Sequence, residues 1–114
     1  MNTTENNKLI AEFMGYVLND NTGVTVYYND KTCEVLDPDK LKFHSDWNWL
    51  MEVVEKIENL GFEVVIGRIS CNVNEILNRE NPITSIVCGN PSKKLEVVYS
   101  SICQFIQWHN QQNQ

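Results

Sequence analysis

The fold class of this chain is decided by the stretch Asp46-Trp-Asn-Trp-Leu-Met-Glu-Val-Val-Glu-Lys-Ile-Glu-Asn-Leu-Gly61 and by Phe62-Glu-Val-Val-Ile66, which follows it directly. In the first stretch, apolar residues recur every three or four positions and form one stripe along a helix. Ser45 or Asp46 is a suitable N-cap for this helix, and Gly61 is a suitable end. The second stretch is apolar on both faces after Glu63, which predicts an interior strand of a sheet.

Outward from this helix and strand, the chain shows further segments of both kinds. A short first helix is predicted from the spacing of Leu9, Ile10, Phe13 and Val17, and Gly15 is a natural stop for it. The remaining predicted elements are strands 24–28, 32–36, 71–76 and 83–88, and a last helix that begins at Asn90 or Ser92. The predicted order is therefore α-β-β-α-β-β-β-α. This order indicates an α+β single-domain sandwich, in which a mostly antiparallel sheet of about five strands is covered by helices.

Length and composition agree with one ordinary globular domain. The 114 residues are 42% hydrophobic and 21% charged, near the globular average. We therefore expect residues 1–110 to form a single domain and residues 111–114 to form a flexible tail. Nine Lys and Arg stand against fifteen Asp and Glu, a net charge of -6. This acidic balance argues against binding to DNA, RNA or anionic membranes, because such binding depends on a basic surface.

The N-terminus and the cysteines predict an intracellular protein. Residues 1–8 lack the apolar core of a secretory signal, and no run approaches the roughly 18 apolar residues that span a bilayer. The four cysteines contain no C-x-x-C pair and lie in or beside apolar segments. They are therefore expected to be reduced and buried.

The turn Gly89-Asn-Pro-Ser-Lys-Lys94 is the strongest candidate for a ligand site. A strand, a glycine turn and a helix start leave backbone N–H groups and the positive end of the helix dipole free to hold an anion. Two lysines in a first helical turn are unfavourable unless an anion or a carboxylate faces them. No P-loop motif is present. The candidate ligand-binding residues are Gly89, Asn90, Ser92, Lys93 and Lys94, and the alternative is two surface lysines paired with nearby Glu.

Arg68, Trp47 and Trp49 would complete this site. Arg68 lies where strand 62–66 ends and could pair with a phosphate or carboxylate, although an Arg at a strand end commonly reaches into solvent. Trp47 and Trp49 lie about 80° to either side of the apolar stripe of the second helix. One of them could stack on a base, and the alternative is that both seal the edges of the helix–sheet interface.

No catalytic or metal-binding set is recognisable, so the chain is predicted to be no enzyme and to need no cofactor. His44 and Asp46 flank Ser45, but neighbouring residues point apart and do not form a triad. Two histidines and scattered cysteines do not match a tetrahedral metal site.

The last helix carries a second apolar side. Val97 and Trp108 lie about 20° apart around its axis, opposite its main stripe, with Ser101 on the same flank. Large exposed aromatic residues are generally covered by a partner. We therefore predict a homo-oligomer interface at Val97, Ser101 and Trp108, and the alternative is that the sheet wraps around this side of the helix.

Several segments resemble small phage proteins of the phage ABA-sandwich domain family. The resemblance is carried by Lys8-Leu-Ile-Ala-Glu-Phe-Met-Gly15, Asp46-Trp-Asn-Trp-Leu-Met51, Val53-Val-Glu-Lys-Ile-Glu58, Asn78-Arg-Glu-Asn-Pro82 and Phe105-Ile-Gln-Trp-His-Asn110. It covers most of the chain outside residues 19–41. The resemblance implies an α/β sandwich and a viral origin, and it brings no established activity or catalytic residues.

Together with the basic turn, this resemblance predicts a phage accessory protein that acts by binding in the cytoplasm of the bacterial host cell. The expected ligand is a small anionic, nucleotide-derived immune signal of the host, sequestered by a homo-oligomer. Lys93, Lys94 and Arg68 would neutralise phosphates, while Trp47 or Trp49 would stack on the base. One alternative is a protein-interaction module that inhibits a host factor without a small ligand, and another is a hydrolase of such nucleotides.

Overall fold

The second helix and the strand after it form as the sequence predicts. Helix α2 spans Trp47–Asn59 and strand β4 spans Phe62–Ile66. The Asp46 side chain caps α2 by accepting a hydrogen bond from the Asn48 N–H at 2.8 Å. At the other end, Gly61 adopts a φ of 99°, the left-handed conformation that favours glycine. The chain therefore reverses direction directly after α2, and β4 packs against α2.

The computed structural model describes residues 3–19, 26–29, 34–36, 40–76 and 80–112. The other helices are α1 (Thr3–Phe13) and α3 (Lys94–Gln112), which follows the short 3-10 helix η2 (Pro91–Lys93). The other strands are β1 (Val17–Asn19), β2 (Val26–Asn29), β3 (Glu34–Leu36), β5 (Ser70–Glu75) and β6 (Thr84–Val87). Parts of the predicted strands, residues 24–25 and 32–33, lie outside the described residues.

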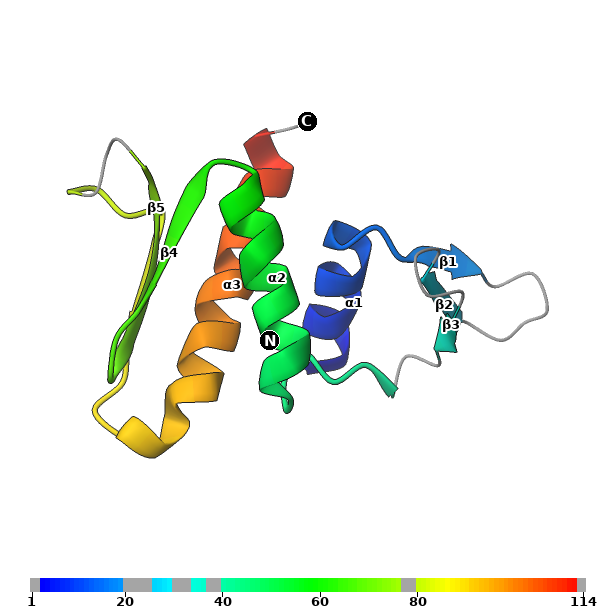
Figure 1. Cartoon of the computed structure of the whole chain (residues 1–114), viewed down its shortest axis with the longest axis horizontal. Coiled ribbons are helices and arrows are strands. Elements are labelled where there is room, and N and C mark those ends of the chain that lie inside the picture. Colours follow the sequence, from blue (N-terminus) through cyan, green and yellow to red (C-terminus); the bar gives the residue numbers. More distant parts are fainter. Residues whose placement is uncertain (1–2, 20–25, 30–33, 37–39, 77–79, 113–114) are drawn as a thin grey trace.

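The described strands form two antiparallel sheets. Strands β4, β5 and β6 pair in that order, with Val64 opposite Val73 and Cys71 opposite Ile86. Strands β1, β2 and β3 form a second sheet, which lies beyond α1, away from the first sheet (Figure 1). The prediction of one sheet of about five strands is therefore wrong. The helices stand between the two sets of strands and prevent them from pairing.

The core of this α+β globule lies between the β4–β5–β6 sheet and the helices. Alternate side chains of β5, Cys71 and Val73, are fully buried against α3. The largest fully buried side chains are Phe43, Phe105, Ile10, Leu41, Leu50, Ile57, Ile102, Ile106, Val53, Val73 and Val98. In the described part of the chain, no helix combines the length and apolar character of a membrane span. The cysteines within it, Cys71, Cys88 and Cys103, are free thiols.

Three features differ from their predicted form. Gly15, with a φ of 87°, ends α1 as the sequence predicts, but Val17, which the apolar spacing grouped with the helix, begins β1. Strand β4 is an edge strand, and β5 is the central one. Helix α3 continues to Gln112, through half of the segment that we expected to be a flexible tail, because glutamine is a good helix former.

Candidate functional site

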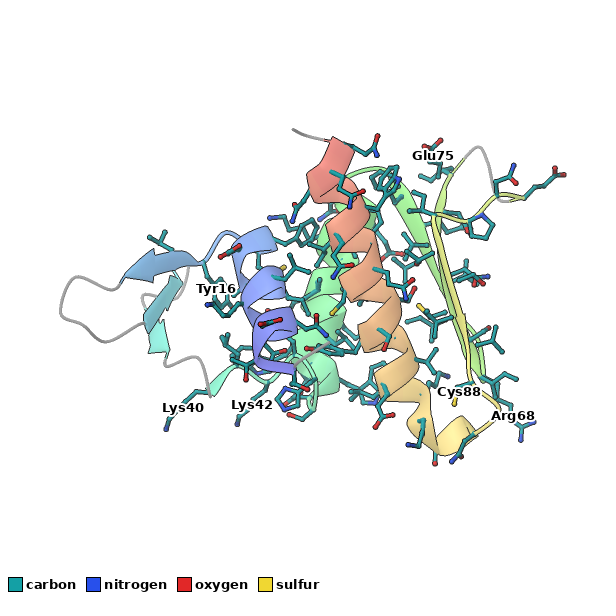
Figure 2. All side chains as sticks on the ribbon, turned by 180° about the vertical axis from the view of Figure 1, so that it is seen from behind. Tyr16, Lys40, Lys42, Arg68, Glu75 and Cys88 are labelled. Atoms are coloured by element: carbon teal, nitrogen blue, oxygen red, sulfur yellow. The ribbon has the colours of Figure 1, made fainter. Side chains whose placement is uncertain are left out.

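The helices of the described residues run in the same direction and begin at one end of the molecule (Figure 1). The turn between β4 and β5 and the start of α3 lie at this end as well. Figure 2 places Lys40 and Lys42 here on the side of α1, and Arg68 on the side of the sheet. Helix N-termini carry partial positive charge. Glu5, Asp46 and Glu96 also stand at the helix starts. The helix N-termini and the three basic side chains nevertheless make this end, which we call the basic end, a candidate for an anion site.

Backbone hydrogen bonds bring Arg68 and the predicted Gly89–Lys94 turn to one corner of the basic end. The Gly67 N–H donates to the Ser70 carbonyl at 2.8 Å, which closes the β4–β5 turn around Arg68. The Cys88 N–H donates to the Ile69 carbonyl, also at 2.8 Å. Arg68 and Cys88 accordingly lie at the same corner (Figure 2). We call the side chains of Arg68, Lys93 and Lys94 the basic corner.

Two backbone N–H groups of the turn are already bonded within it. Asn90 caps η2, and its side-chain oxygen accepts from the Ser92 N–H at 3.0 Å and from the Ser92 hydroxyl at 2.8 Å. The Lys93 N–H donates to the Asn90 carbonyl at 3.1 Å. The expectation that these amides are free for an anion is therefore wrong, because Asn90 occupies them. Gly89 has no left-handed φ, so its backbone does not require glycine.

The basic side chains of the corner have different surroundings. Lys93 Nζ lies 3.6 Å from the Glu96 carboxylate, and both side chains are more than half exposed. This is the surface pair named above as the alternative, and such exposed pairs contribute at most about 1 kcal/mol. Lys94 is half-buried and Arg68 is exposed. Among the described residues, no carboxylate forms an ion pair with either of them.

The two tryptophans are not equivalent. The Trp49 ring packs edge-on against Phe43, with ring centroids 5.1 Å apart, and Phe43 contacts Tyr16 after α1. Trp49 is thus held in the packing between α2 and the α1 side and is not brought to the basic corner. Trp47 is 39% exposed. Within the described residues, no contact joins Trp47 to the basic corner either.

The predicted oligomer interface lies inside the fold. Val97 is 4% exposed and Ser101 is fully buried. The Ser101 hydroxyl lies 2.7 Å from the Thr84 hydroxyl of β6, and Trp108 is half-buried against the core. The sheet therefore covers this side of α3, as the alternative held. Val97, Ser101 and Trp108 do not form a free surface for a second copy.

The structure also joins polar residues that the sequence analysis did not connect. Asn7 is 3% exposed, and its amide donates to the Leu41 carbonyl at 3.2 Å and contacts His44 Nδ1 at 2.9 Å. The Tyr99 hydroxyl donates to Asn7 Oδ1 at 2.9 Å, and burial raises the pKa of Tyr99. This network fastens α1 to α3 and to the segment before α2. No local pattern signals it, because its members come from separate segments.

The arrangement offers chemistry of one kind, the neutralisation of an anion by Arg68, Lys93 and Lys94. In the part of the chain that the structure describes, no three His, Cys, Asp or Glu side chains lie together as a metal ion would require. Comparison of the chain with known protein families, with characterised proteins and with solved structures finds no match.

Proposed function

We propose that this chain acts by binding a small anionic molecule at the basic corner. One observation carries the proposal: the Ile69–Cys88 hydrogen bond brings the turn that holds Arg68 beside the start of the Gly89–Lys94 turn, at the end where the helices begin, in a chain of net charge -6. Lys94 lies in the first turn of α3, at the positive end of the helix dipole, where its charge is unfavourable. Lys93 lies beside it and forms an exposed pair with Glu96. A bound anion would offset the unfavourable charge of Lys94. A small anion suits the corner better than a polymer, because the chain as a whole is acidic.

A nucleotide-derived ligand fits the chemistry of these residues. The Arg68 guanidinium can pair with two oxygens of a phosphate, while Lys93 and Lys94 act as point charges. Trp47 is the more exposed tryptophan and is the one that we assign to stacking on a base. Trp49 is left out of this role because its ring is packed on Phe43. The proposal is one of binding without turnover.

In the wider proposal, the chain is a phage accessory protein of the ABA-sandwich type that sequesters an immune signal in the host cytoplasm. The sequence resemblance supports this assignment. The helices here lie on one face of the β4–β5–β6 sheet, whereas an α/β sandwich has a helical layer on each face. A homo-oligomer would have to use a surface other than Val97, Ser101 and Trp108. If light scattering finds a monomer, the homo-oligomer is no longer part of the proposal.

A thermal-shift panel tests the binding proposal. Cyclic nucleotides and ADP-ribose are the probes, and adenosine is the control that lacks phosphate. A ligand present at 100 times its Kd stabilises the folded state by about 2.7 kcal/mol, which should raise Tm by several degrees.

The matched variants change the net charge by the same amount at different places. Lys93→Gln with Lys94→Gln should abolish the rise in Tm. Gln104→Glu with Gln111→Glu, at exposed positions of α3, should leave it unchanged. Failure of every nucleotide to stabilise the protein, or equal stabilisation of the lysine variant, would overturn the proposal.

A second candidate function, inhibition of a host protein by direct contact, is favoured by a different surface. The sheet packs α2 and α3 on one face, and Val65 and Val87 project from the other face with 43% and 67% exposure. Affinity capture from host lysate with the wild type and with the variant Val65→Ser, Val87→Ser would distinguish inhibition of a host protein from binding of a small anion. Loss of a captured protein in the variant, with nucleotide stabilisation unchanged or absent, would favour this function.

A further inference from the structure

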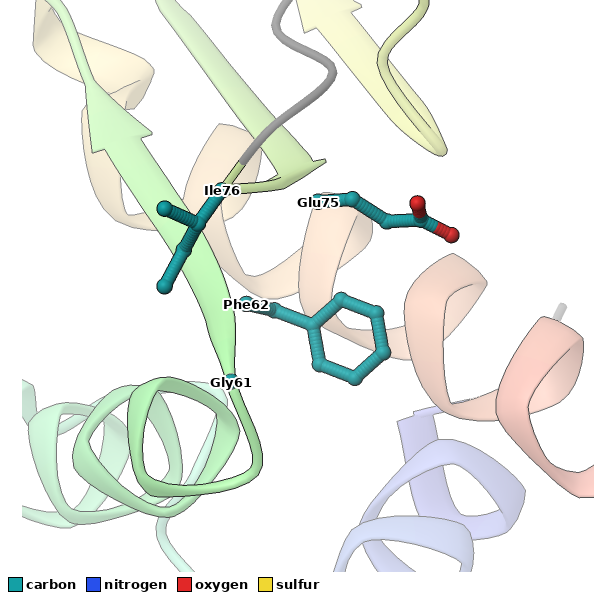
Figure 3. A pocket seen from close by; sticks show the side chains of 4 residues that line it. All are labelled: Gly61, Phe62, Glu75 and Ile76. Atoms are coloured by element: carbon teal, nitrogen blue, oxygen red, sulfur yellow. The ribbon is translucent and has the colours of Figure 1, made fainter.

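A pocket lies at the end of the molecule opposite the basic end. It has a volume of about 560 Å³ and is lined by Gly61, Phe62, Glu75 and Ile76 (Figure 3). Volumes of roughly 300–1,000 Å³ are typical of small-molecule sites. None of these residues belongs to the basic corner, so the pocket is a separate candidate site.

The pocket lies where strand β4 begins and strand β5 ends. Gly61 reverses the chain after α2, and the Cβ position of this glycine meets no atom within 4 Å. Phe62 begins β4 and lies opposite Glu75, near the end of β5, in the antiparallel register. Residues directly opposite each other project from the same face of a sheet. The Glu75 side chain accordingly extends alongside the Phe62 ring (Figure 3).

The Phe62 ring is held firmly by other aromatic side chains. Its centroid lies 4.9 Å from that of Phe105 and 6.0 Å from that of Trp108, with interplanar angles of 68° and 85°. Such edge-to-face contacts are the favoured geometry of aromatic pairs. The pocket therefore combines a fixed apolar ring with the exposed carboxylate of Glu75.

The electrostatics of this end favour a cation. Helices α1, α2 and α3 all end here (Figure 1), and helix C-termini carry partial negative charge on their free carbonyls. The same end already holds one internal cation against an aromatic ring. The Lys56 ammonium donates to the Phe13 carbonyl and lies 4.9 Å from the centroid of the Phe13 ring, a cation–π distance.

We propose that the pocket binds a small organic cation with an apolar body. The ammonium or guanidinium group of this ligand pairs with the Glu75 carboxylate, and its hydrocarbon part packs on the Phe62 ring. Glu75 and the helix C-termini disfavour an anionic ligand relative to a cationic one. The site is independent of the anion site proposed above, because the two lie at opposite ends of the molecule (Figure 2).

Three compounds with the same carbon skeleton test the site: 4-phenylbutylamine, 4-phenylbutanol and 4-phenylbutyrate. In two-dimensional ¹H–¹⁵N NMR titrations, the amine should shift the backbone signals of Gly61, Phe62, Glu75 and Ile76 in a saturable way. It should bind roughly threefold to fivefold more tightly than the alcohol, as expected for an exposed ion pair. The carboxylate should bind most weakly. Absence of saturable shifts at these residues, or equal affinities for the three compounds, would contradict the proposal.

Two single substitutions separate the role of Glu75 from a general effect of charge. Glu75→Gln should bring the affinity for the amine down to that for the alcohol. Glu52→Gln removes one carboxylate from an exposed position of α2 and should keep the preference for the amine. A preference that survives in Glu75→Gln would overturn the proposal. The variant Lys93→Gln with Lys94→Gln should bind the amine normally, so this result is independent of the outcome at the basic corner.

Discussion

At the scale of single residues, most buried polar side chains that the structure describes are hydrogen-bonded to another buried side chain. Asn7 and Tyr99 join α1 to α3, and Ser101 and Thr84 join α3 to β6. A buried polar group that loses its partner destabilises a protein by about 1–3 kcal/mol. These pairs therefore restrict how α3 can sit against its neighbours. Asn74 contrasts with them, because its buried side-chain oxygen has no hydrogen-bond partner among the described residues.

The buried thiols predict a loss of stability at alkaline pH. Burial raises the pKa of Cys103 from 9.0 to about 12 and also raises the pKa of Cys71. Above about pH 9 the unfolded chain releases thiol protons that the folded chain retains, so the free energy of unfolding falls as the pH rises toward 12. The slope is about 1.4 kcal/mol per pH unit for each such thiol.

Urea unfolding across this alkaline range measures the effect. Cys103→Ala should show a shallower decline than the wild type, because one of the thiols that drives the decline is missing. A free energy of unfolding that stays constant well above pH 9, or a slope that is the same in the variant, would contradict the prediction.

At the scale of elements, two glycines that look alike in the sequence have different roles. Each follows a regular element and precedes another, Gly61 between α2 and β4 and Gly89 between β6 and η2. Only Gly61 of the two adopts a positive φ, at 99°. The reversal after α2 therefore depends on glycine, whereas the turn before η2 is capped by the side chain of Asn90.

Alanine substitutions at these two positions form a matched pair. An added Cβ meets nothing within 4 Å at either site, so the comparison isolates the backbone conformation. Gly61→Ala should lower the free energy of unfolding by about 1–2 kcal/mol, and Gly89→Ala should change it by less than about 0.5 kcal/mol. Urea unfolding of both variants measures the difference, and equal effects would show that the assignment of roles is mistaken.

The elements were predictable to the extent that their signals are local. The Asp46 cap, the apolar stripe of α2 and the stop at Gly61 all lie within one stretch, and α2 forms where they indicate. Strand β4 shows the limit of such signals. Its apolar run is typical of an interior strand, yet β4 is at the edge of the sheet and its apolar inner face packs toward the helices. The apolar run of β4 predicts that its side chains are buried, but it does not predict whether neighbouring strands or helices bury them.

At the scale of the whole molecule, one aromatic side chain connects three elements. Phe105 on α3 is fully buried, and its ring centroid lies 6.4 Å from that of Phe13 on α1 and 4.9 Å from that of Phe62 on β4. The Phe105 ring of α3 is therefore in contact with both α1 and β4. Removal of the Phe105 side chain should therefore lower the free energy of unfolding of the whole protein.

Phe105→Ala should lower the free energy of unfolding by about 3–5 kcal/mol, because it removes buried area and leaves a cavity. The neighbouring Gln104 is exposed on the same helix, and Gln104→Ala should change stability by less than about 0.5 kcal/mol. Chemical denaturation of the two variants provides the comparison. A loss below about 1 kcal/mol in Phe105→Ala would show that the three elements do not depend on this ring.

The parallel course of the helices also gives the molecule two electrically different ends. Their dipoles add because all of them begin at one end and finish at the other (Figure 1). Arg68, Lys93 and Lys94 increase the positive character of the first end, and Glu75 stands at the second. This arrangement underlies both proposals, an anion site at the first end and a cation site at the second.

By itself, the sequence determined the helices and strands near α2, the capping residues and the basic composition of the Gly89–Lys94 turn, because spacing, caps and glycines act over a few residues. Only the tertiary structure decided that the strands divide into two sheets, that Val97 and Ser101 face the sheet, and that Arg68 lies beside the lysine turn. Contacts between distant segments depend on how whole elements pack against each other. That packing is set by the surfaces of several elements together, which no single local pattern contains.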